Sequence, residues 1–254
     1  MRDKIYFITD AHLGTGPDTA QREHQLCQWL ESIRADARML FLLGDMFDYW
    51  FTYRYVVPRG HIRLLGKLAE MADDGVELHY FLGNHDMWLF DYLTSEMSIT
   101  MHDDPALMTI DGKRFLIGHG DGLGHLDPHY DRLRRIFRSR LNQRLFSCLP
   151  QWLTFGIATG WSRKSRSSHP VESERYMGDS REGIVLHCRQ QMMNEPIDFC
   201  VFGHRHTPLS RIITADNGRQ SLYVNVGDWL DHRSYAVYTH SDGLQLCEWA
   251  FQQR

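Results

Sequence analysis

The chain lacks a long apolar run, a low-complexity tract and any closely paired cysteines. No stretch of about 18 apolar residues is present, so the sequence predicts no membrane-spanning helix. The five cysteines are odd in number and none has C-x-x-C spacing, which argues against a disulfide scaffold and a thiolate zinc site. The N-terminal residues lead into a strand-like stretch without an apolar segment of signal-peptide length. We therefore expect a cytoplasmic protein whose cysteines are free, at Cys27, Cys148, Cys188, Cys200 and Cys247.

An excess of positive charge is also missing. Lys and Arg number 28 against 32 Asp and Glu, which gives a net charge of −4. This balance argues against nucleic-acid binding by bulk charge, although it allows a local basic patch. What the chain does contain is histidine, at 15 residues. Because imidazole is the commonest side-chain ligand of transition metals, the positions of these histidines matter.

Short apolar runs alternate with helical patterns in the first half of the chain. The apolar runs predict strands at 5–8, 39–43, 78–82 and 115–117. Apolar residues at helical spacing predict helices at 21–33 and 61–71. Strands joined by helices through short connections are typical of βαβ units in an α/β fold. Strands return after residue 195, with hairpin turns at 216–218 and 241–243, and are predicted at 199–202, 209–214, 221–226, 235–238 and 244–249.

Helical patterns dominate between residues 128 and 191. The helix predicted over 130–146 has an apolar side and a side made almost wholly of arginine. Between Tyr130 and Arg166 there are nine basic residues and a single acidic one, Asp131. Such a segment could line a groove for acyl chains and bind phosphate or anionic lipid. It could equally pack its apolar side on the core and leave the arginines as a solvated face.

Polar clusters follow the ends of the predicted strands. Ligands of open α/β sheets bind beyond the carboxyl ends of the strands, where such clusters can converge. A glycine before the cluster allows the backbone to turn sharply and brings the side chain forward. The clusters are Asp10-Ala11-His12, Gly44-Asp45-Met46-Phe47-Asp48, Gly83-Asn84-His85-Asp86, His119-Gly120-Asp121 and Gly203-His204-Arg205-His206.

Together the clusters offer two Asp, one Asn and four His as metal ligands, and no sulfur. This set suits Mn²⁺, Fe or Zn²⁺ better than Cu⁺, and its histidines disfavour Ca²⁺. Seven ligands exceed the need of one tetrahedral metal. They fit two cations about 3.5–4 Å apart that share a bridging carboxylate, as in phosphatases and nucleases. Taken singly, each cluster is compatible with an ordinary turn or cap, but their joint occurrence in this order indicates a dinuclear site.

In these blocks and their order, the sequence resembles the calcineurin-like metallophosphoesterases over residues 5–230. The family pattern is Asp-x-His, Gly-Asp-x-x-Asp, Gly-Asn-His-Asp or Glu, a His-Gly-Asp-like segment and Gly-His-x-His, and every block is present. The resemblance implies a four-layer α/β/β/α metallophosphoesterase sandwich. We expect one such domain over 1–254, with a helical lid insertion at 122–195.

The same resemblance implies a role for each residue of the blocks. It assigns one ligand set to each of two divalent cations, namely Asp10, His12 and His206 to one and Asn84, His119 and His204 to the other. Asp45 would bridge the two cations. His85 would face the substrate, where it stabilises or protonates the phosphate and the leaving oxygen. Asp86 would hold the ring of His85.

Residues 45–50, 119–121 and 127–130, followed by the Arg-rich helix, resemble one branch of that family, the UDP-2,3-diacylglucosamine pyrophosphohydrolases of lipid A synthesis. That resemblance implies cleavage of an amphiphilic nucleotide-sugar lipid to UMP and 2,3-diacylglucosamine 1-phosphate beneath the lid. Mn²⁺ is the implied metal, with Zn²⁺ or Fe as alternatives. We also expect peripheral association with the inner leaflet of the inner membrane and no obligate protein partner. Candidate substrate-binding residues are Asp127, Tyr130, Arg163, Lys164 and Arg166.

One residue departs from that branch, because its best-known members have Arg at the position of His85. The substrate could therefore be a different phosphoester, such as a soluble nucleotide or a nucleic acid, whose phosphates the basic insertion would meet. A binding module without turnover is a third hypothesis, and the complete ligand set argues against it. Release of UMP from the lipid substrate with added Mn²⁺ separates the first hypothesis from the other two.

Overall fold

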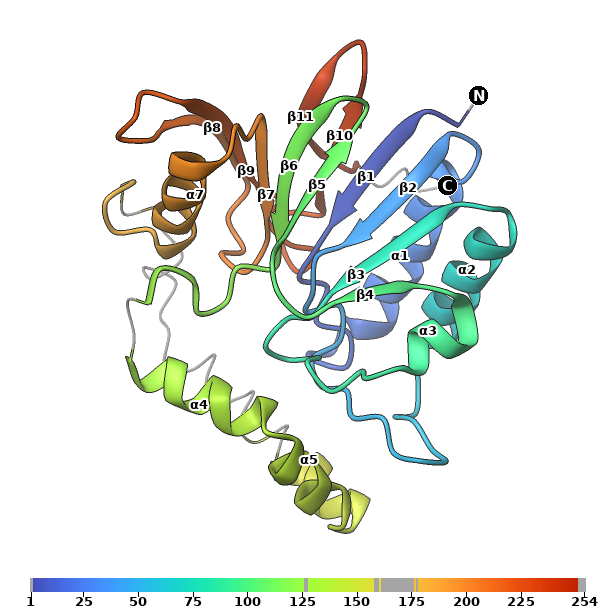
Figure 1. Ribbon diagram of the computed structural model, residues 1–254. Helices are drawn as coiled ribbons and strands as arrows, with labels where there is room; N and C mark the ends of the chain where they lie inside the picture. Colours follow the sequence, from blue (N-terminus) through green and yellow to red (C-terminus); the bar gives the residue numbers. More distant parts are fainter. Residues whose placement is uncertain (1, 126–127, 158–159, 161–175, 177, 251–254) are drawn as a thin grey trace.

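Two β sheets lie face to face between layers of helices in the computed structural model, which describes residues 2–125, 128–157, 160, 176 and 178–250 (Figure 1). The first sheet has the strand order β11-β10-β1-β2-β3-β4, and the second has the order β5-β6-β7-β9-β8. The strands of the first sheet are β1 (Lys4–Ile8), β2 (Ala37–Leu42), β3 (Glu77–Phe81), β4 (Thr100–His102), β10 (Ser234–Thr239) and β11 (Gly243–Glu248). Those of the second are β5 (Ala106–Ile110), β6 (Lys113–Gly118), β7 (Phe199–Phe202), β8 (Leu209–Thr214) and β9 (Gln220–Asn225).

The centre of each sheet is parallel, as the apolar runs predict. β1, β2, β3 and β4 pair in parallel, and so do β6, β7 and β9. Most residues of β1, β2, β3 and β7 are buried, and strands buried on both faces require continuous apolar runs rather than alternation. The hairpins predicted at 216–218 and 241–243 are confirmed, since they join the antiparallel pairs β8–β9 and β10–β11.

Three separate apolar clusters fill the spaces between four layers. One lies between the first sheet and the helices α1 (Thr19–Ile33), α2 (Ile62–Asp73) and α3 (Tyr92–Met97). A second lies between the two sheets, where the ring of Phe7 stacks on those of Phe41 and Phe115 at centroid distances of 5.0 and 6.2 Å. The third lies between the second sheet and α7 (Gly183–Asn194). The predicted four-layer α/β/β/α sandwich is therefore confirmed.

Short elements and one helix differ from the sequence-based expectation. The apolar periodicity does not identify α3, β4 and β5, which have three to six residues each and depend on tertiary contacts for their form. The helix predicted over 130–146 is two helices, α4 (Pro128–Arg138) and α5 (Arg140–Ser147). The break falls at Ser139, whose extended backbone (φ −68°, ψ 118°) ends one helix and begins the next.

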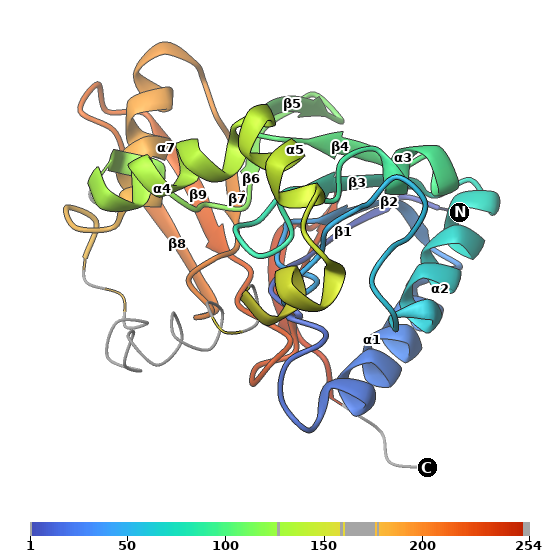
Figure 2. The ribbon, with the colours of Figure 1, turned by 90° about the horizontal axis from the view of Figure 1, so that it is seen from below.

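Helices α4 and α5 lie outside the sandwich, across the ends of the strands (Figures 1 and 2). Trp88, after β3, anchors them. Its indole N–H donates to the carbonyl oxygen of Phe137 (2.9 Å), and its ring contacts that of Phe146 at 4.9 Å. Other apolar side chains of this segment face solvent, among them Leu141 and Leu145. The apolar side predicted for this segment is thus partly packed and partly exposed.

All five cysteines are free, as the sequence predicts. Within the described part of the chain, no helix combines the length and apolar character that crossing a membrane requires.

Candidate metal centre

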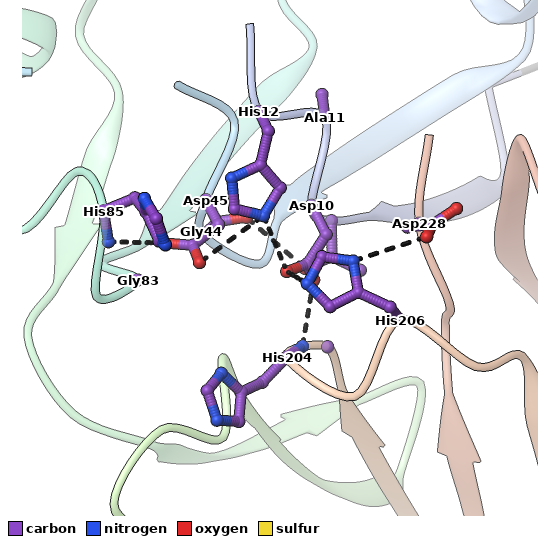
Figure 3. Close-up of polar contacts among 12 residues, drawn as sticks. Asp10, Ala11, His12, Gly44, Asp45, Gly83, His85, His204, His206 and Asp228 are labelled. Carbon is purple, nitrogen blue, oxygen red and sulfur yellow. Dashed lines mark hydrogen bonds and ion pairs between the residues drawn. The ribbon is translucent and has the colours of Figure 1, made fainter. Parts of the chain in front are cut away.

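The strand ends of both sheets deliver the predicted metal ligands to one place. They follow β1, β2 and β3 of the first sheet and β6 and β7 of the second: Asp10, His12, Asp45, Asn84, His119, His204 and His206. Figure 3 shows the side chains of Asp10, His12, Asp45 and His206 pointing toward one another. The predicted convergence of distant strand ends is therefore present.

Asp10 has one satisfied and one unsatisfied carboxylate oxygen. Its Oδ2 accepts hydrogen bonds from the hydroxyl of Thr9 and from the backbone N–H of His204 (2.9 Å). Its Oδ1 has no hydrogen-bond donor among the described residues, and lies 3.6 Å from His12 Nε2 and 3.4 Å from His206 Nε2. Both ring nitrogens of His12 are buried without a hydrogen-bond partner as well. Because unpaired buried polar atoms are rare, this group of atoms fits a cation between them.

Asp45 lies between the two halves of the cluster. Its Oδ1 accepts a hydrogen bond from the backbone N–H of His85 (2.8 Å). Its Oδ2 lies 3.8 Å from His12 Nε2 and 3.5 Å from His119 Nε2. Asn84 Oδ1 lies 3.3 Å from the same His119 nitrogen. A carboxylate oxygen between imidazoles of two different sheets has the position that a bridging ligand needs.

His119 and His206 are held so that one ring nitrogen of each is left for another partner. Nδ1 of His119 donates to the carbonyl oxygen of Leu43 (2.7 Å), and Nδ1 of His206 donates to the carboxylate of Asp228 (3.3 Å). Because both acceptors lack a proton to give, Nδ1 carries the hydrogen in the neutral ring and Nε2 presents its lone pair. A metal-binding imidazole is held in this way.

The ligand loops have an unusual backbone. Left-handed φ values between 41° and 69° occur at Asp10, His12, Asp45, His204 and His206. Such a conformation costs a non-glycine residue on the order of 1–3 kcal/mol, and it persists only where the surroundings enforce it. Here the N–H of Asp10 donates to the carbonyl of Gly44 (3.0 Å), and that of His12 donates to the carbonyl of Asp45 (2.9 Å). Residue 203 is a glycine because its backbone passes close to Asp10, so that a Cβ there would lie 2.7 Å from Asp10 Oδ2.

His85 contributes a further ring to the cluster, from the loop after β3. Its ring meets that of His12 edge-on, with centroids 4.7 Å apart. Its Nδ1 donates to the backbone carbonyl of Asp48 (3.0 Å) and lies 3.6 Å from the Asp48 carboxylate. Asp48 therefore holds the ring of His85.

The expectation that Asp86 holds the ring of His85 is wrong. Asp86 is buried and accepts hydrogen bonds from the backbone N–H groups of Gly83 and Met46 (both 2.9 Å) and from the hydroxyl of Tyr80. Next to His85 in a tight turn, Asp86 points into the core rather than toward the metal cluster. It ties the loop after β3 to the loop after β2. Burial, together with the charge of Asp45, raises the pKa of Asp86 to about 6.

Burial and neighbouring charges both shift the pKa values of the cluster, in opposite directions at Asp45 and in the same direction at His204. Burial alone raises the pKa of Asp45, but the imidazoles of His119 and His85 lower it well below its usual value. Burial lowers the pKa of His204 to about 4, and His119 adds to the effect. At neutral pH the carboxylate of Asp45 is therefore ionised and the imidazole of His204 is neutral. These are the forms that bind divalent cations.

Three groups of side chains in the described ranges place one ligand atom each within 4.8 Å of the others. They are Asp10, His12 and His206; Asp10, Asp45 and His119; and His12, Asp45 and His85. The first group coincides with one predicted ligand set. The third includes His85, which the family resemblance assigns to the substrate. The metal content of a His85 variant therefore decides between these two roles.

Of the candidate substrate-binding residues, Tyr130 lies within the described structure. Its hydroxyl donates to Oδ2 of Asp121 (3.0 Å), and Nε of Arg134 donates to the same oxygen (3.1 Å). Because Asp121 is buried and follows His119 by two residues, these contacts join α4 to a ligand loop. The remaining candidates lie outside the described residues: Asp127, Arg163, Lys164 and Arg166.

Asp228 belongs to the site, although the strand-end pattern does not include it. Besides His206, its carboxylate binds the backbone N–H groups of Asp231 and His232 (both 3.0 Å). The pair Gly227-Asp228 comes shortly after β9 and repeats the Gly-Asp form of the second cluster. The same search, extended to the last parallel strand, would have identified it.

Known proteins are similar to this chain over nearly its whole length. The family model described as calcineurin-like phosphoesterase matches residues 3–208. A protein of Porphyromonas gingivalis named UDP-2,3-diacylglucosamine hydrolase is 42% identical over 261 residues, which cover 97% of this chain and 97% of that protein. A protein of the same name from Edwardsiella ictaluri is 30% identical over 246 residues, which cover 95% of this chain and 90% of that protein.

Proposed function

The chain belongs to the calcineurin-like phosphoesterase family, and on that premise we propose that it hydrolyses the pyrophosphate bond of UDP-2,3-diacylglucosamine. The products are UMP and 2,3-diacylglucosamine 1-phosphate. Relatives at 42% and 30% identity carry the name of this hydrolase. These relatives do not favour the alternative function, in which the chain would be an esterase that acts on soluble nucleotides or nucleic acid.

The structural observation that best supports a hydrolase is a group of buried polar atoms without hydrogen-bond partners, namely Oδ1 of Asp10 and both ring nitrogens of His12. Members of this family use divalent metal ions, and a buried carboxylate oxygen that faces two imidazole nitrogens at 3.4 and 3.6 Å suits such an ion. When bound, two cations supply the Lewis acidity that activates water and offsets the charge of the phosphates.

We assign the ligands as two sets around a shared carboxylate. Asp45 is the bridging residue, because its Oδ2 lies near imidazoles of both sheets. The sets are Asp10, His12 and His206 on one side and Asn84, His119 and His204 on the other. Mn²⁺ is the metal we propose, with Zn²⁺ or Fe as alternatives, because oxygen and imidazole ligands suit all three.

His85 is the residue we place against the substrate. Because its Nδ1 donates to the Asp48 carbonyl, its Nε2 is the nitrogen left for a phosphate oxygen. In the imidazolium form, which carries a hydrogen on Nε2 as well as on Nδ1, it stabilises developing negative charge or gives a proton to the leaving oxygen. Asp48 orients the ring.

Within the helical insertion expected at 122–195, the surface for the acyl chains is provided by α4, α5 and the residues that follow them, since α7 packs on the second sheet. Leu141, Leu145 and Trp152 are 66%, 61% and 76% exposed, and arginines of α4 and α5 lie among them. Apolar side chains interleaved with arginine also suit the anionic surface of the inner membrane, with which we propose peripheral association. Tyr130 and the candidate residues outside the described part would contact the substrate's polar groups.

The reaction is tested by incubating the metal-depleted full-length protein with UDP-2,3-diacylglucosamine in detergent micelles, with and without Mn²⁺. We expect UMP to appear only when the metal is added. Efficient cleavage of a soluble aryl phosphodiester without any release of UMP would refute the lipid substrate.

Membrane association is tested by cosedimentation with vesicles that contain anionic phospholipid. The variant Leu141→Ser/Leu145→Ser should sediment less than the unmodified protein. Ile212→Ser, on β8, is the matched control because Ile212 is also exposed, at 55%. Equal sedimentation of all three proteins would exclude this surface as the membrane contact.

A further inference from the structure

Arg22 is a buried cation in the first turn of α1, and it is 8% exposed. Its guanidinium donates to three main-chain carbonyls. Nε donates to Ala11 (2.7 Å), and Nη2 donates to His12 (3.0 Å) and Thr15 (2.8 Å). In the described part of the chain, no carboxylate lies within ion-pair distance of it. Because burying a charge is costly, this geometry points to a specific role for the three contacts.

The three carbonyls belong to the loop that carries Asp10 and His12. The N–H side of this loop is bonded to the next ligand loop, through Asp10 to Gly44 and through His12 to Asp45. Arg22 binds the carbonyl side. The loop is therefore fixed on both sides, by the next ligand loop through its N–H groups and by Arg22 through its carbonyl oxygens.

His12 depends on this support more than other imidazoles of the cluster do. His119 is oriented by the Leu43 carbonyl and His206 by Asp228. Neither ring nitrogen of His12 has a hydrogen-bond partner among the described residues. The nearest group to Nδ1 of His12 in the ion-pair contacts is the Asp48 carboxylate, at 3.6 Å. With a left-handed backbone (φ 41°) and no hydrogen bond to its ring, His12 depends for its direction on the loop more than His119 and His206 do.

We propose that Arg22 is a positioning residue that fixes the loop of Asp10 and His12 and thereby sets the affinity of their metal site. The inference rests on the metal centre of the proposed function. Arg22 contacts neither cation nor substrate. Arginine is needed because its planar guanidinium reaches several acceptors at once, whereas lysine presents a single ammonium group.

The test compares Mn²⁺ binding to metal-free, full-length proteins by calorimetry, with the stoichiometry and the affinity as readouts. Arg22→Met keeps the apolar stem and removes the donors, and Arg22→Lys keeps the charge. The matched control is Gln25→Met. Gln25 lies on the same helix, is 4% exposed and accepts a hydrogen bond from Arg233 (2.9 Å), outside the ligand loop.

We expect two equivalents of Mn²⁺ to bind to the unmodified protein and to Gln25→Met with the same affinities. In Arg22→Met one equivalent should bind about 10–100-fold more weakly, the usual effect of losing a group that supports a ligand. Arg22→Lys should show a smaller loss at the same equivalent.

Unchanged affinities for both equivalents in a folded Arg22→Met protein would overturn the inference. If Arg22→Met does not fold, Arg22→Lys decides by the same criterion. Failure of both to fold would assign Arg22 to the fold as a whole, and so also overturn it. If the unmodified protein itself does not bind two equivalents, the proposed metal centre is refuted and this inference falls with it.

Discussion

Asp45 contacts imidazoles that come from both sheets, so a single carboxylate oxygen serves both halves of the cluster. Asp45→Asn replaces that anionic oxygen with a neutral amide. We expect UMP release to fall to background and metal content to drop from two equivalents, measured by the UMP assay and by elemental analysis. Asp111→Asn, which alters an ion pair with Arg38 (2.8 Å) away from the site, is the control. Full activity in Asp45→Asn would disprove the two-metal mechanism.

His85 is placed either as a substrate-facing group or as a ligand, and one substitution separates these roles. In His85→Ala we expect kcat to fall roughly 10²–10⁴-fold with both metal equivalents retained, because only charge stabilisation or proton transfer is lost. The measurement pairs steady-state kinetics with metal analysis. Loss of one equivalent would show that His85 ligates, as its group with His12 and Asp45 allows.

For single residues, the sequence predicts the metal ligands better than it predicts the residues that hold those ligands in place. Asp10 and His12 were identified because both the residue type and the strand end point to a metal. Asp86 was misassigned because sequence adjacency does not reveal which way a turn points its side chain. Arg22 has a recognisable signal, since it stands on the apolar stripe with Leu26 and Trp29, but its acceptors are carbonyls of a distant loop.

Helix α4 is attached to the sandwich by ion pairs rather than by a buried face. No residue of α4 is fully buried. Arg134 and Arg138 donate to Asp104 (3.1 and 2.8 Å), and Arg134 also reaches Asp121. The pairs with Asp104, which is 65% exposed, contribute little each, so this helix is held more weakly than α1 or α2.

Acidification should therefore loosen α4. Burial raises the pKa of Asp104, but Arg138 and Arg134 outweigh this and lower it below its usual value. A lowered carboxyl pKa contributes stability that is present above the unfolded value of about 3.9 and is lost as pH falls through the folded value. The protection factors of residues 128–138, which correct hydrogen exchange for its intrinsic dependence on pH, should be unchanged between pH 7 and 5 and smaller below about pH 4.

A substitution gives the same information at neutral pH. Asp104→Asn should speed hydrogen exchange in α4 at pH 7, and Asp111→Asn should not. Equal exchange in both variants would show that the contacts of Trp88 with Phe137 and Phe146 hold the helix without the ion pairs.

Elements were predictable where their own residues decide their form. The apolar runs of β1, β2 and β3 identify them, since strands buried on both faces require such runs. β4 and β5 were missed because a short strand takes its form from its neighbours in the sheet. The break at Ser139 was missed because the apolar spacing continues through it.

For the whole molecule, binding of cations adds stability to the folded state. Each site filled by Mn²⁺ at 100 times its Kd should stabilise by about 2.7 kcal/mol, which raises Tm by roughly 5–10 °C per site for a chain of this size. Differential scanning calorimetry measures the shift, and a chelator should reverse it. In Asp45→Asn the shift should shrink. Identical Tm values for the unmodified protein with and without Mn²⁺ would contradict a built metal site.

The ligands are divided between two sheets that pack on each other through an apolar layer. Asp10, His12 and Asp45 extend from one, and His119 and His206 from the other. Cations bound among them form a non-covalent cross-link at one end of the sandwich, which resists shear between the layers. Loss of the cations would then remove this link between the sheets together with the chemistry that the cations supply.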